Sequence, residues 1–462
     1  NLTQLSNLNT DTGKLSLYQV PEGETVLEAV EKFNQRQKVA WAEPNYRYHT
    51  MAEPNDEYYQ SQQWGHLRTN LEAAWDIEKG SNSVTVAVVD SGIIPNHPDL
   101  QDNLMQGADF VGGTMNSSPS NYNITDNDPT DETSASNGGS HGTHCAGIIG
   151  AVGNNSTGVA GVNWNLNILP VRAGYNGAFN GWDIAEGVYY AVDQGADIIN
   201  LSLGNYESSK LAEDYLDYAK QNDVVVVAAA GNKGQTPIGY PARYDYTIAV
   251  GATDINNRRT GYSDYGPKLD LVAPGGTSSD RIASTWGYYN GEPIPSYKGL
   301  KGTSMAAPYV SGVAALLMSN GITDVEKIKH RLKSTAVDLG SSGEDDYYGA
   351  GLVDAYGALL NKRLTDPYVF AVHETADGTE VISEISQING DRSYKLTKVE
   401  PKKALICAWR DVNNNEKIAA GDYWGVSSNT IDIKENSINN LNLDMYYVTE
   451  EEGSSLNVQG LK

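Results

Sequence analysis

A chain of 462 residues is longer than most single domains, and we expect it to fold as two or three. Its formal net charge of −25 argues against a nucleic-acid partner, because an acidic surface repels phosphates. With 39% hydrophobic residues it can form cores, yet no apolar stretch approaches the roughly 18 residues of a membrane span.

The N-terminal segment, residues 1–51, is expected to contain both strand and helix. We predict a strand at Leu15–Val20, a helix at Glu24–Phe33 and a second strand at Val39–Tyr48. Apolar residues at helical spacing support the helix. The segment is too short to bury much surface alone, so it needs a partner surface.

From about Pro54 to Asn361, continuous apolar runs alternate with helix-like stretches. The runs predict buried strands at Val84–Val89, Leu166–Val171, Ile198–Leu203, Val224–Ala230 and Thr247–Val250. Helices are expected at Asp183–Gln194, Lys210–Gln221, Met305–Met318 and Val325–Ser334. This alternation predicts an α/β fold, in which helices cover both faces of a mostly parallel sheet. Such sheets bind ligands at the carboxyl ends of their strands.

After about Asp366 the helical signal stops. Short alternating runs separated by turn residues predict strands at Tyr368–Val372, Val381–Ile385, Tyr394–Val399, Ala404–Trp409, Thr430–Ile433 and Leu441–Val448. The series is typical of a small antiparallel β-sandwich. We therefore divide the chain into an N-terminal segment at 1–51, a central domain at 52–366 and a β-sandwich at 367–462.

Four short motifs in the central domain carry residues suited to catalysis. Asp90 ends a buried apolar strand, and His141 opens the run His-Gly-Thr-His-Cys-Ala-Gly. Ser304 lies in Gly-Thr-Ser-Met-Ala-Ala-Pro before an apolar helix, and Asn232 follows the end of another strand. A serine, a histidine and an aspartate at strand and helix ends can meet at one edge of a parallel sheet.

The chemistry of these side chains is that of a nucleophilic serine. A serine hydroxyl needs a neighbouring base, and histidine serves because its pKa lies near neutral pH. A buried aspartate can fix the imidazole tautomer and stabilise its charged form. The oxyanion that forms on the attacked carbonyl needs fixed donors, which the Asn232 amide and the backbone N–H of Ser304 can supply.

These motifs, in the chain order Asp, His, Ser, closely resemble those of the subtilisin-like serine proteases, the subtilase family. The resemblance covers about Pro54 to Asn361. It implies a serine endopeptidase acting on protein or peptide substrates, with residues 52–366 as its catalytic domain. By this resemblance Asp90 orients the imidazole, His141 acts as base and then acid, Ser304 attacks, and Asn232 holds the oxyanion. We expect a monomer.

The resemblance also implies where the substrate binds. An edge segment would pair with the substrate as an added strand, and two short walls would enclose the residue that precedes the cleaved bond. The residues are Ser202, Leu203 and Gly204 on the edge segment and Ala229, Ala230, Gly231 and Gly239 on the walls. Small wall residues without a carboxylate predict cleavage after large apolar or aromatic residues, with broad tolerance.

The loop Gly153–Val159 resembles the strong calcium site of the family. Calcium prefers six to eight oxygen ligands. The resemblance implies a set made of the side chains of Asp56, Asp99 and Asn155 and the carbonyls of Gly153, Thr157 and Val159. An ordinary Asn/Gly turn is the alternative.

A second calcium candidate lies in the C-terminal segment. Oxygen-bearing side chains at Asp411, Asn413, Asn415 and Asp422 have the spacing of an EF-hand-like loop. Glu416 stands where a glycine would allow the sharp turn, and Asp422 replaces the bidentate glutamate. A polar β-hairpin loop fits these residues equally well.

Residues 1–51 resemble the carboxyl end of a subtilase propeptide, most clearly in Val39–Tyr46. The resemblance implies an intramolecular inhibitor and folding aid whose tail occupies the active-site cleft. Maturation would cut between about His49 and Glu53, in an autoprocessed precursor of a secreted enzyme. A permanent N-terminal subdomain is the alternative.

The two cysteines, Cys145 and Cys407, allow at most one disulfide. Because Cys145 lies inside the histidine motif, we expect a free thiol there. His141 and His144 are three residues apart and could alternatively bind zinc, but the sequence marks no third ligand nearby.

Two other functions compete with the protease. A catalytically silent scaffold could bind partners through its β-domain, although it would not need the intact catalytic motifs. An esterase of the α/β-hydrolase type is disfavoured, because the serine lacks a Gly-x-Ser-x-Gly elbow and the triad order differs. The β-domain has no evident nucleophile or acid pair, so we expect it to serve a structural or substrate-docking role.

Overall fold

A computed structural model describes residues 53–111, 126–137 and 139–363, with shorter stretches between residues 3 and 39 and between 368 and 459. The chain divides into two compact units, Asn1–Met51 and Ala52–Lys462. None of the described helices is long and apolar enough to cross a membrane. Cys145 and Cys407 are both buried, free thiols, as expected for Cys145.

In the N-terminal unit, β1 (Thr3–Thr10) and β2 (Gly13–Gln19) form an antiparallel hairpin whose register pairs Thr10 with Gly13. Strand β2 covers most of the strand predicted at 15–20. Strand β1 was not predicted, because its sequence is largely Thr, Asn and Ser. The helix predicted at 24–33 and the strand at 39–48 lie largely outside the described residues.

The central domain is built on a seven-stranded sheet of order β11-β10-β9-β8-β3-β5-β4, in which every neighbouring pair is parallel. The strands are β3 (Thr85–Asp90), β4 (Ala108–Asp109), β5 (Asn167–Arg172), β8 (Ile198–Leu201), β9 (Val225–Ala229), β10 (Ile248–Thr253) and β11 (Leu271–Pro274). The five predicted strands are confirmed. The prediction missed β4 and β11, which are too short to stand out as apolar runs.

Side chains alternate across this sheet, as the strand period of two requires. In β3, Val86 and Val88 belong to one buried cluster, whereas Ala87 and Val89 belong to a second. A sheet with two buried faces needs cover on both sides, which explains why its strands are continuously apolar.

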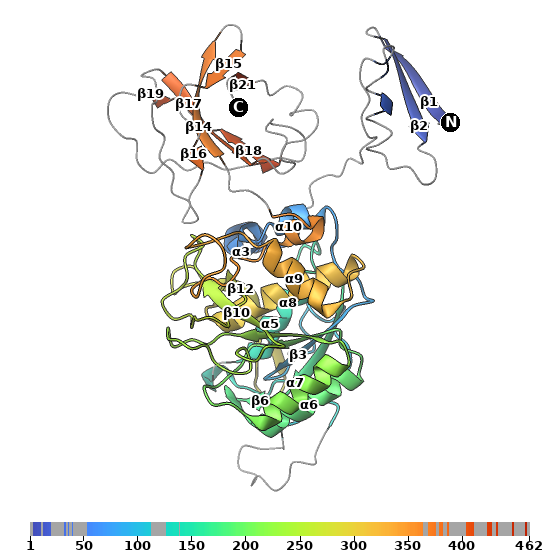
Figure 1. Cartoon of the computed structure of the whole chain (residues 1–462). Helices are drawn as coiled ribbons and strands as arrows, with labels where there is room; N and C mark the ends of the chain where they lie inside the picture. The colour runs from blue at the N-terminus through green and yellow to red at the C-terminus, as the bar shows by residue number, and fades with distance from the viewer. Residues whose placement is uncertain are drawn as a thin grey trace. The chain divides into compact units, whose positions relative to one another are not determined.

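Helices supply that cover (Figure 1). Those contributing two or more buried residues to the first cluster are α4 (Leu71–Trp75), α5 (His141–Gly150), α8 (Thr303–Ser319), α9 (Val325–Ser334) and α10 (Ala355–Leu360). Those contributing to the second are α6 (Gly181–Asp193) and α7 (Lys210–Gln221). The predicted α/β fold with helices on both faces is therefore confirmed.

Smaller elements complete the central domain. They are α2 (Tyr59–Gln62), α3 (Trp64–Arg68), the 3₁₀ turn η2 (Ala135–Asn137), the hairpin β6 (Gly174–Tyr175) with β7 (Ala178–Phe179), and the hairpin β12 (Ile282–Tyr289) with β13 (Pro293–Leu300). Helix α5 contacts β12. The helix that begins at His141 therefore packs against the β12–β13 hairpin as well as against the sheet and α8.

The described strands of the C-terminal segment form one sheet, in which only β15 and β21 pair in parallel. They are β14 (Tyr368–Thr375), β15 (Gly378–Val381), β16 (Ser386–Gln387), β17 (Lys403–Arg410), β18 (Tyr423–Val426), β19 (Ile431–Asp432), β20 (Tyr446–Tyr447) and β21 (Val458–Gln459). The strands predicted at 368–372 and 404–409 are present, whereas 394–399 lies outside the described residues. The sandwich and the boundary at 366 stay predictions.

The close approach of α5 to β12 gives a stability prediction. A Cβ at Gly147 would overlap the hydroxyls of Ser284 and Thr285, which donate to the carbonyls of His144 at 2.8 Å and Thr143 at 2.7 Å. We expect Gly147→Ala to lower the free energy of unfolding by about 1–3 kcal/mol, because the added carbon overpacks a buried contact. Denaturant unfolding measures this.

The matched control is Gly181→Ala at the start of α6, where an added Cβ meets no atom within 4 Å. Its stability should stay within about 0.5 kcal/mol of the parent. Equal stabilities for the two variants would show that α5 has room to move away from β12.

Candidate active site

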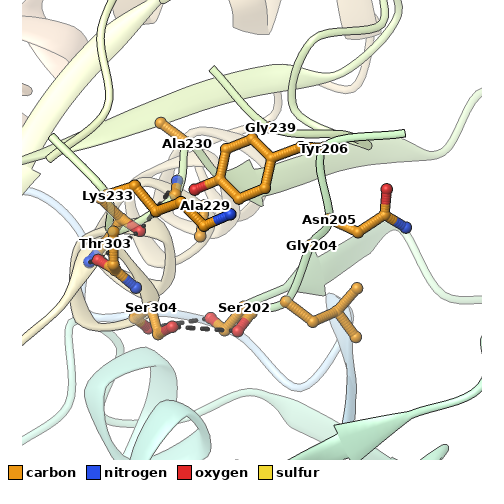
Figure 2. Close-up of a pocket in the computed structure, with 13 residues that line it drawn as sticks. Ser202, Gly204, Asn205, Tyr206, Ala229, Ala230, Lys233, Gly239, Thr303 and Ser304 are labelled. Atoms are coloured by element: carbon orange, nitrogen blue, oxygen red, sulfur yellow. Dashed lines mark hydrogen bonds between the residues drawn. The ribbon is translucent and has the colours of Figure 1, made fainter. Parts of the chain in front are cut away.

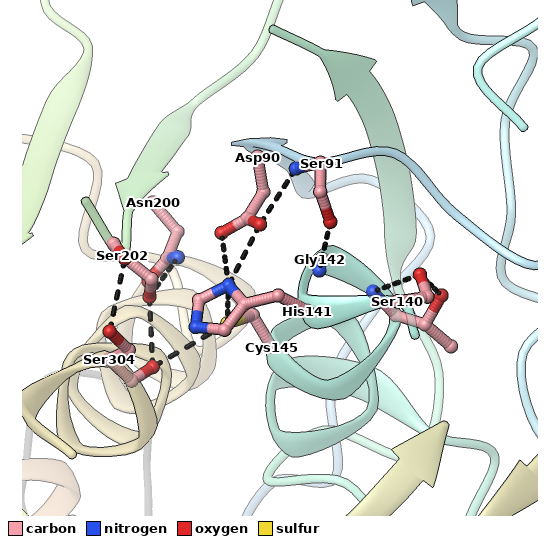
Figure 3. A network of polar contacts seen from close by, with 10 residues as sticks. Asp90, Ser91, Ser140, His141, Gly142, Cys145, Asn200, Ser202 and Ser304 are labelled. Atoms are coloured by element: carbon pink, nitrogen blue, oxygen red, sulfur yellow. Dashed lines mark hydrogen bonds and ion pairs between the residues drawn. The ribbon is translucent and has the colours of Figure 1, made fainter. Parts of the chain in front are cut away.

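Three predicted residues lie at element ends around one edge of the sheet: Asp90 is the last residue of β3, His141 the first of α5 and Ser304 the second of α8. Nδ1 of His141 lies 2.8 Å from Oδ1 and 3.0 Å from Oδ2 of Asp90 (Figure 3). The backbone N–H of Ser91 also donates to Oδ1, at 2.7 Å. The buried carboxylate thus holds the ring through Nδ1, so that Nε2 can exchange a proton with another group.

The Asp90 carboxylate controls the charge of the imidazole. Burial lowers the pKa of His141, but the charges of Asp90 and Cys145 and the hydrogen bonds to both together outweigh burial and raise this pKa well above the ordinary value of 6.5. The side chain of His141 keeps 31% of its surface exposed, whereas that of Asp90 is 0% exposed. A substrate can therefore reach the ring but not the carboxylate.

Helix α5 begins at His141. Ser140 is its N-cap, and the serine hydroxyl accepts from the backbone N–H of Thr143 at 3.4 Å. The backbone N–H of Gly142 donates to the hydroxyl of Ser91 at 3.0 Å. Two of the first backbone N–H groups of the helix thereby have acceptors, which fixes the position of the helix start and of the His141 side chain.

The Ser304 hydroxyl donates to the backbone carbonyl of Ser202 at 3.1 Å rather than to His141 (Figure 3). The sulfur of Cys145 lies between His141 and Ser304, at 3.9 Å from Nδ1 of His141 and 3.5 Å from the carbonyl oxygen of Ser304. Rotation about χ1 redirects a serine hydroxyl among staggered positions. Catalytic hydrogen bonds are often long or misaligned before substrate binds.

Pro308 explains the unusual partners of Ser304. Proline has no N–H to donate to the carbonyl four residues earlier, which here belongs to Ser304. That carbonyl instead accepts from the hydroxyl of Ser202 at 2.9 Å and from the Cys145 thiol. The break in the helical pattern thus ties the start of α8 to the edge segment and to α5.

Asn232 lies beside the first residues of α8. Its side-chain oxygen accepts from the backbone N–H and the hydroxyl of Thr303, at 2.9 and 3.1 Å. With the oxygen engaged, the amide N–H groups remain to donate elsewhere. The backbone N–H of Ser304 donates to no acceptor in the described part of the chain. Two donors are therefore available where an oxyanion could bind.

A cavity of about 250 Å³ opens next to Ser304 (Figure 2). All seven predicted substrate-binding residues line it: Ser202, Leu203, Gly204, Ala229, Ala230, Gly231 and Gly239. A Cβ would clash at each glycine of this lining, as two of them show. A Cβ at Gly204 would lie 2.6 Å from the carbonyl oxygen of Tyr240, and one at Gly239 would lie 2.9 Å from that of Asn205.

The lining also contains residues that the sequence analysis missed, namely Asn205, Tyr206, Lys233 and Thr303. Their only signal in the sequence is adjacency, because Lys233 follows Asn232 and Tyr206 follows the edge segment. Nothing in those loops indicates which side chains turn toward the cavity.

The two histidines of the α5 motif have separate partners. Nε2 of His144 donates to the carbonyls of Lys298 at 3.0 Å and Ile282 at 3.1 Å. Burial lowers the pKa of His144 to about 3, so the ring is neutral. His144 therefore anchors α5 to the β12–β13 hairpin, and the geometry offers no zinc position shared with His141.

The first predicted calcium loop brings two buried carboxylates together. Asp99 accepts from the side-chain amide of Asn155 and from the N–H of Val159, each at 2.9 Å. Asp56 accepts from the N–H of Asn154 at 2.7 Å through Oδ2, while its buried Oδ1 has no partner among the described residues. Burial, together with the charge of Asp56, raises the pKa of Asp99 to about 6. An orphaned carboxylate oxygen beside a second carboxylate fits a cation.

The second calcium candidate, Asp411–Asp422, lies outside the described residues.

Comparison with known proteins assigns the chain to a family. The model of the subtilase family matches residues 81–351. The chain belongs to the subtilase family. It is 39% identical over 347 residues to the thermophilic serine proteinase of Bacillus sp. strain AK1, covering 75% of this chain and 78% of that protein. It is 41% identical over 307 residues to thermitase of Thermoactinomyces vulgaris, covering 66% of this chain and 99% of thermitase.

A solved structure agrees with this assignment. A protease from Pseudoalteromonas arctica PAMC 21717 superposes with a TM-score of 0.60 at 34% identity, covering 66% of this chain and 98% of that one. The protein is thus a subtilisin-like serine endopeptidase, and the predicted family is confirmed. Its substrates are proteins or peptides.

The hydrogen bond between Asp90 and His141 gives a prediction about charge in this subtilase. In Asp90→Asn the carboxylate charge is lost while the burial remains, so we expect the pKa of His141 to fall below its value in the parent protein. NMR titration of ¹⁵N-labelled histidine side chains measures this directly. His144 is the internal control, because its lowered pKa should keep it neutral in both proteins. An unchanged pKa at His141 would mean that another group sets its charge.

Proposed function

We propose that this subtilase hydrolyses peptide bonds through the triad Asp90, His141 and Ser304 and an acyl-enzyme intermediate. The observation that carries the proposal is the 2.8 Å contact between Nδ1 of His141 and the buried carboxylate of Asp90, beside the start of α8. This contact fixes the tautomer in which Nε2 lacks a proton, which is the form that a general base needs.

Each residue then has one role in the reaction. His141 acts as a base in its neutral form, which its raised pKa makes predominant only at alkaline pH. It removes the hydroxyl proton as Ser304 Oγ attacks the substrate carbonyl, and Asp90 stabilises the imidazolium that results. The oxyanion accepts from the side-chain amide of Asn232 and the backbone N–H of Ser304. When the tetrahedral intermediate collapses, His141 protonates the leaving amine, and water then hydrolyses the ester by the same route.

The substrate would lie along Ser202–Gly204 and pair with its backbone, which gives affinity with little demand on sequence. The cavity between Ala229–Gly231 and Gly239 would take the side chain that precedes the cleaved bond. Because its walls carry small residues and no carboxylate, large apolar or aromatic side chains fit best.

Residues 1–51 would serve as the propeptide, an intramolecular inhibitor that the enzyme removes between about His49 and Glu53 during maturation. The division of the chain into compact units after Met51 supports a separable segment there. The mature enzyme would act as a secreted monomer, with 52–366 as catalytic domain and 367–462 as accessory β-domain.

Two substitutions test the triad and the oxyanion donor. We expect Ser304→Ala to lower kcat/KM on casein peptides by at least about 10⁴-fold, because the nucleophile is lost. Asn232→Ala should lower kcat by about 100- to 1,000-fold with little change in KM, the known cost of one such donor in this enzyme class. Asn222→Ala, at the exposed end of α7, is the matched control.

The same proteins report on maturation. Incubated alone and followed by mass spectrometry, active protein should shorten by cleavage near residues 49–53, and Ser304→Ala should stay intact. If the parent is as inactive as Ser304→Ala, a catalytically silent scaffold replaces the proposed protease. If Ser304→Ala is as active as the parent, Ser304 is not the nucleophile and the triad is ruled out.

We also propose that the loop at 153–159 binds calcium through Asp56, Asp99 and Asn155 and the carbonyls of Gly153, Thr157 and Val159. When bound, the ion would neutralise the buried carboxylates and join residues near the start of the central domain to the loop. The orphaned Oδ1 of Asp56 supports the proposal.

Removal of the ion should destabilise the fold, because a ligand that binds only the native state adds about 2.7 kcal/mol at 100 times its Kd. We expect a chelator to lower the melting temperature of the Ser304→Ala protein, and Asp99→Asn to abolish this effect. Asp217→Asn, an exposed acid on α7, should keep it. A melting temperature unaffected by chelator would favour an ordinary turn.

A further inference from the structure

Asn232, the proposed side-chain donor to the oxyanion, lies in a loop rather than in a helix or strand. Residues 231–235 follow β9 and have no regular secondary structure. A donor is most effective when it is already held where the oxyanion forms, since it then needs no reorganisation as the charge develops. The contacts that hold this loop therefore bear on catalysis.

One residue, Asp264, holds the backbone on both sides of Asn232. The peptide group before the Asn232 Cα includes the carbonyl of Gly231, which accepts from the backbone N–H of Asp264 at 3.0 Å. The peptide group after it includes the N–H of Lys233, which donates to Oδ1 of Asp264 at 3.0 Å. Because each peptide group is planar, fixing both leaves the Cα between them little freedom to turn.

The carboxylate of Asp264 is itself fixed in place. Oδ1 also accepts from the N–H of Gln235 at 2.9 Å, and Oδ2 accepts from the hydroxyl of Tyr206 at 2.5 Å. Burial and the hydrogen bond to Asp264 raise the pKa of Tyr206, so its hydroxyl stays protonated and donates. Asp264 is fully buried, and a Cβ at Gly231 would overlap Oδ2, so the carboxylate packs directly against the loop.

Two supports act on different parts of Asn232. Its side-chain oxygen accepts from Thr303 at the start of α8, which sets the orientation of the amide. Asp264 sets the position of the Cα from which the side chain leaves. Together they fix the point from which the amide N–H groups donate.

We propose that Asp264 is a positioning residue for the reaction, which acts by holding Asn232 where its amide meets the oxyanion. The inference rests on the proposed function, since it assumes that Asn232 is that donor. The acceptor oxygens of Asp264, rather than its charge, carry this role, because a negative charge near an oxyanion opposes the reaction.

The test is a double-mutant cycle that measures kcat and KM for a peptide with phenylalanine before the cleaved bond. Asp264→Ala removes the acceptor oxygens, and it is made both in the parent and in Asn232→Ala. Asp264→Asn removes the charge but keeps one acceptor oxygen for the two backbone N–H groups, while its NH₂ group can donate to the Tyr206 hydroxyl. Tyr206→Phe removes a single hydrogen bond from the carboxylate, and it tests the inference even if Asp264→Ala does not fold.

In the parent we expect Asp264→Ala to lower kcat by about 10- to 100-fold, with KM changing by less than about threefold. In Asn232→Ala the same change should lower kcat by less than about threefold, because the donor that Asp264 positions is already gone. Asp264→Asn should keep kcat within about threefold of the parent. Tyr206→Phe should lower kcat by about three- to tenfold in the parent but not in Asn232→Ala.

Asp354→Ala is the matched control. Asp354 is almost as buried as Asp264, at 1% against 0% exposed. Its oxygens accept from the backbone N–H of Gly357 and the side-chain amide of Asn70, each at 2.8 Å, and it caps α10 rather than the loop that carries Asn232. We expect Asp354→Ala to lower the melting temperature, as Asp264→Ala does, but to leave kcat within about twofold of the parent.

An equal fall in kcat for Asp264→Ala in both backgrounds would overturn the inference, because the two residues would then act independently. A rise in KM without a fall in kcat would also overturn it, since Asp264 would then serve substrate binding alone. If Asn232→Ala lowers kcat but neither Asp264→Ala nor Tyr206→Phe does, only this inference fails. If Asn232→Ala leaves kcat unchanged, the proposed oxyanion donor is wrong and the inference fails with it.

Discussion

The contact between the Asp90 carboxylate and the His141 ring is the interaction on which the site depends. Strand β3 lies between β8 and β5 in the sheet, so its last residue is buried in the middle of the strand ends. A charged carboxylate is costly there unless donors surround it. The backbone N–H of Ser91 and Nδ1 of His141 supply them. The hydrogen bond between Asp90 and His141 therefore stabilises the carboxylate at the strand end and also makes the histidine more basic.

Helix α8 shows how packing and catalysis constrain each other. Nearly all of Thr303–Ser319 is buried, which small and apolar residues allow. Pro308 leaves one carbonyl of the first turn free, and that carbonyl belongs to Ser304. It is taken by Ser202 on the edge segment and by Cys145 on α5. The helix start is therefore fastened to the segment proposed to bind substrate and to the helix that carries His141.

Charge is distributed unevenly in this acidic protein. The buried pair Asp56 and Asp99 has one oxygen without a donor, and the raised pKa of Asp99 reflects how poorly the protein alone supports that charge. Beside the cavity, by contrast, both oxygens of the buried Asp264 carboxylate have donors, namely the hydroxyl of Tyr206 and the backbone N–H groups of Lys233 and Gln235. Local geometry, and not the net charge of −25, decides what each region attracts.

Local patterns in the sequence were sufficient to predict the strands β3, β5, β8, β9 and β10. They also marked Asp90, His141, Ser304 and Asn232, whose catalytic roles stay predictions. Buried parallel strands are continuously apolar, and these residues lie in short contiguous motifs. Strand β4 has only two residues, and β11 has four and ends in a proline, so neither forms an apolar run as long as those that marked the predicted strands. Tyr206 and Asp264 are 58 positions apart, and their contact exists only because two loops meet beyond the sheet edge. Such contacts depend on the direction in which loop side chains turn, which tertiary packing alone decides.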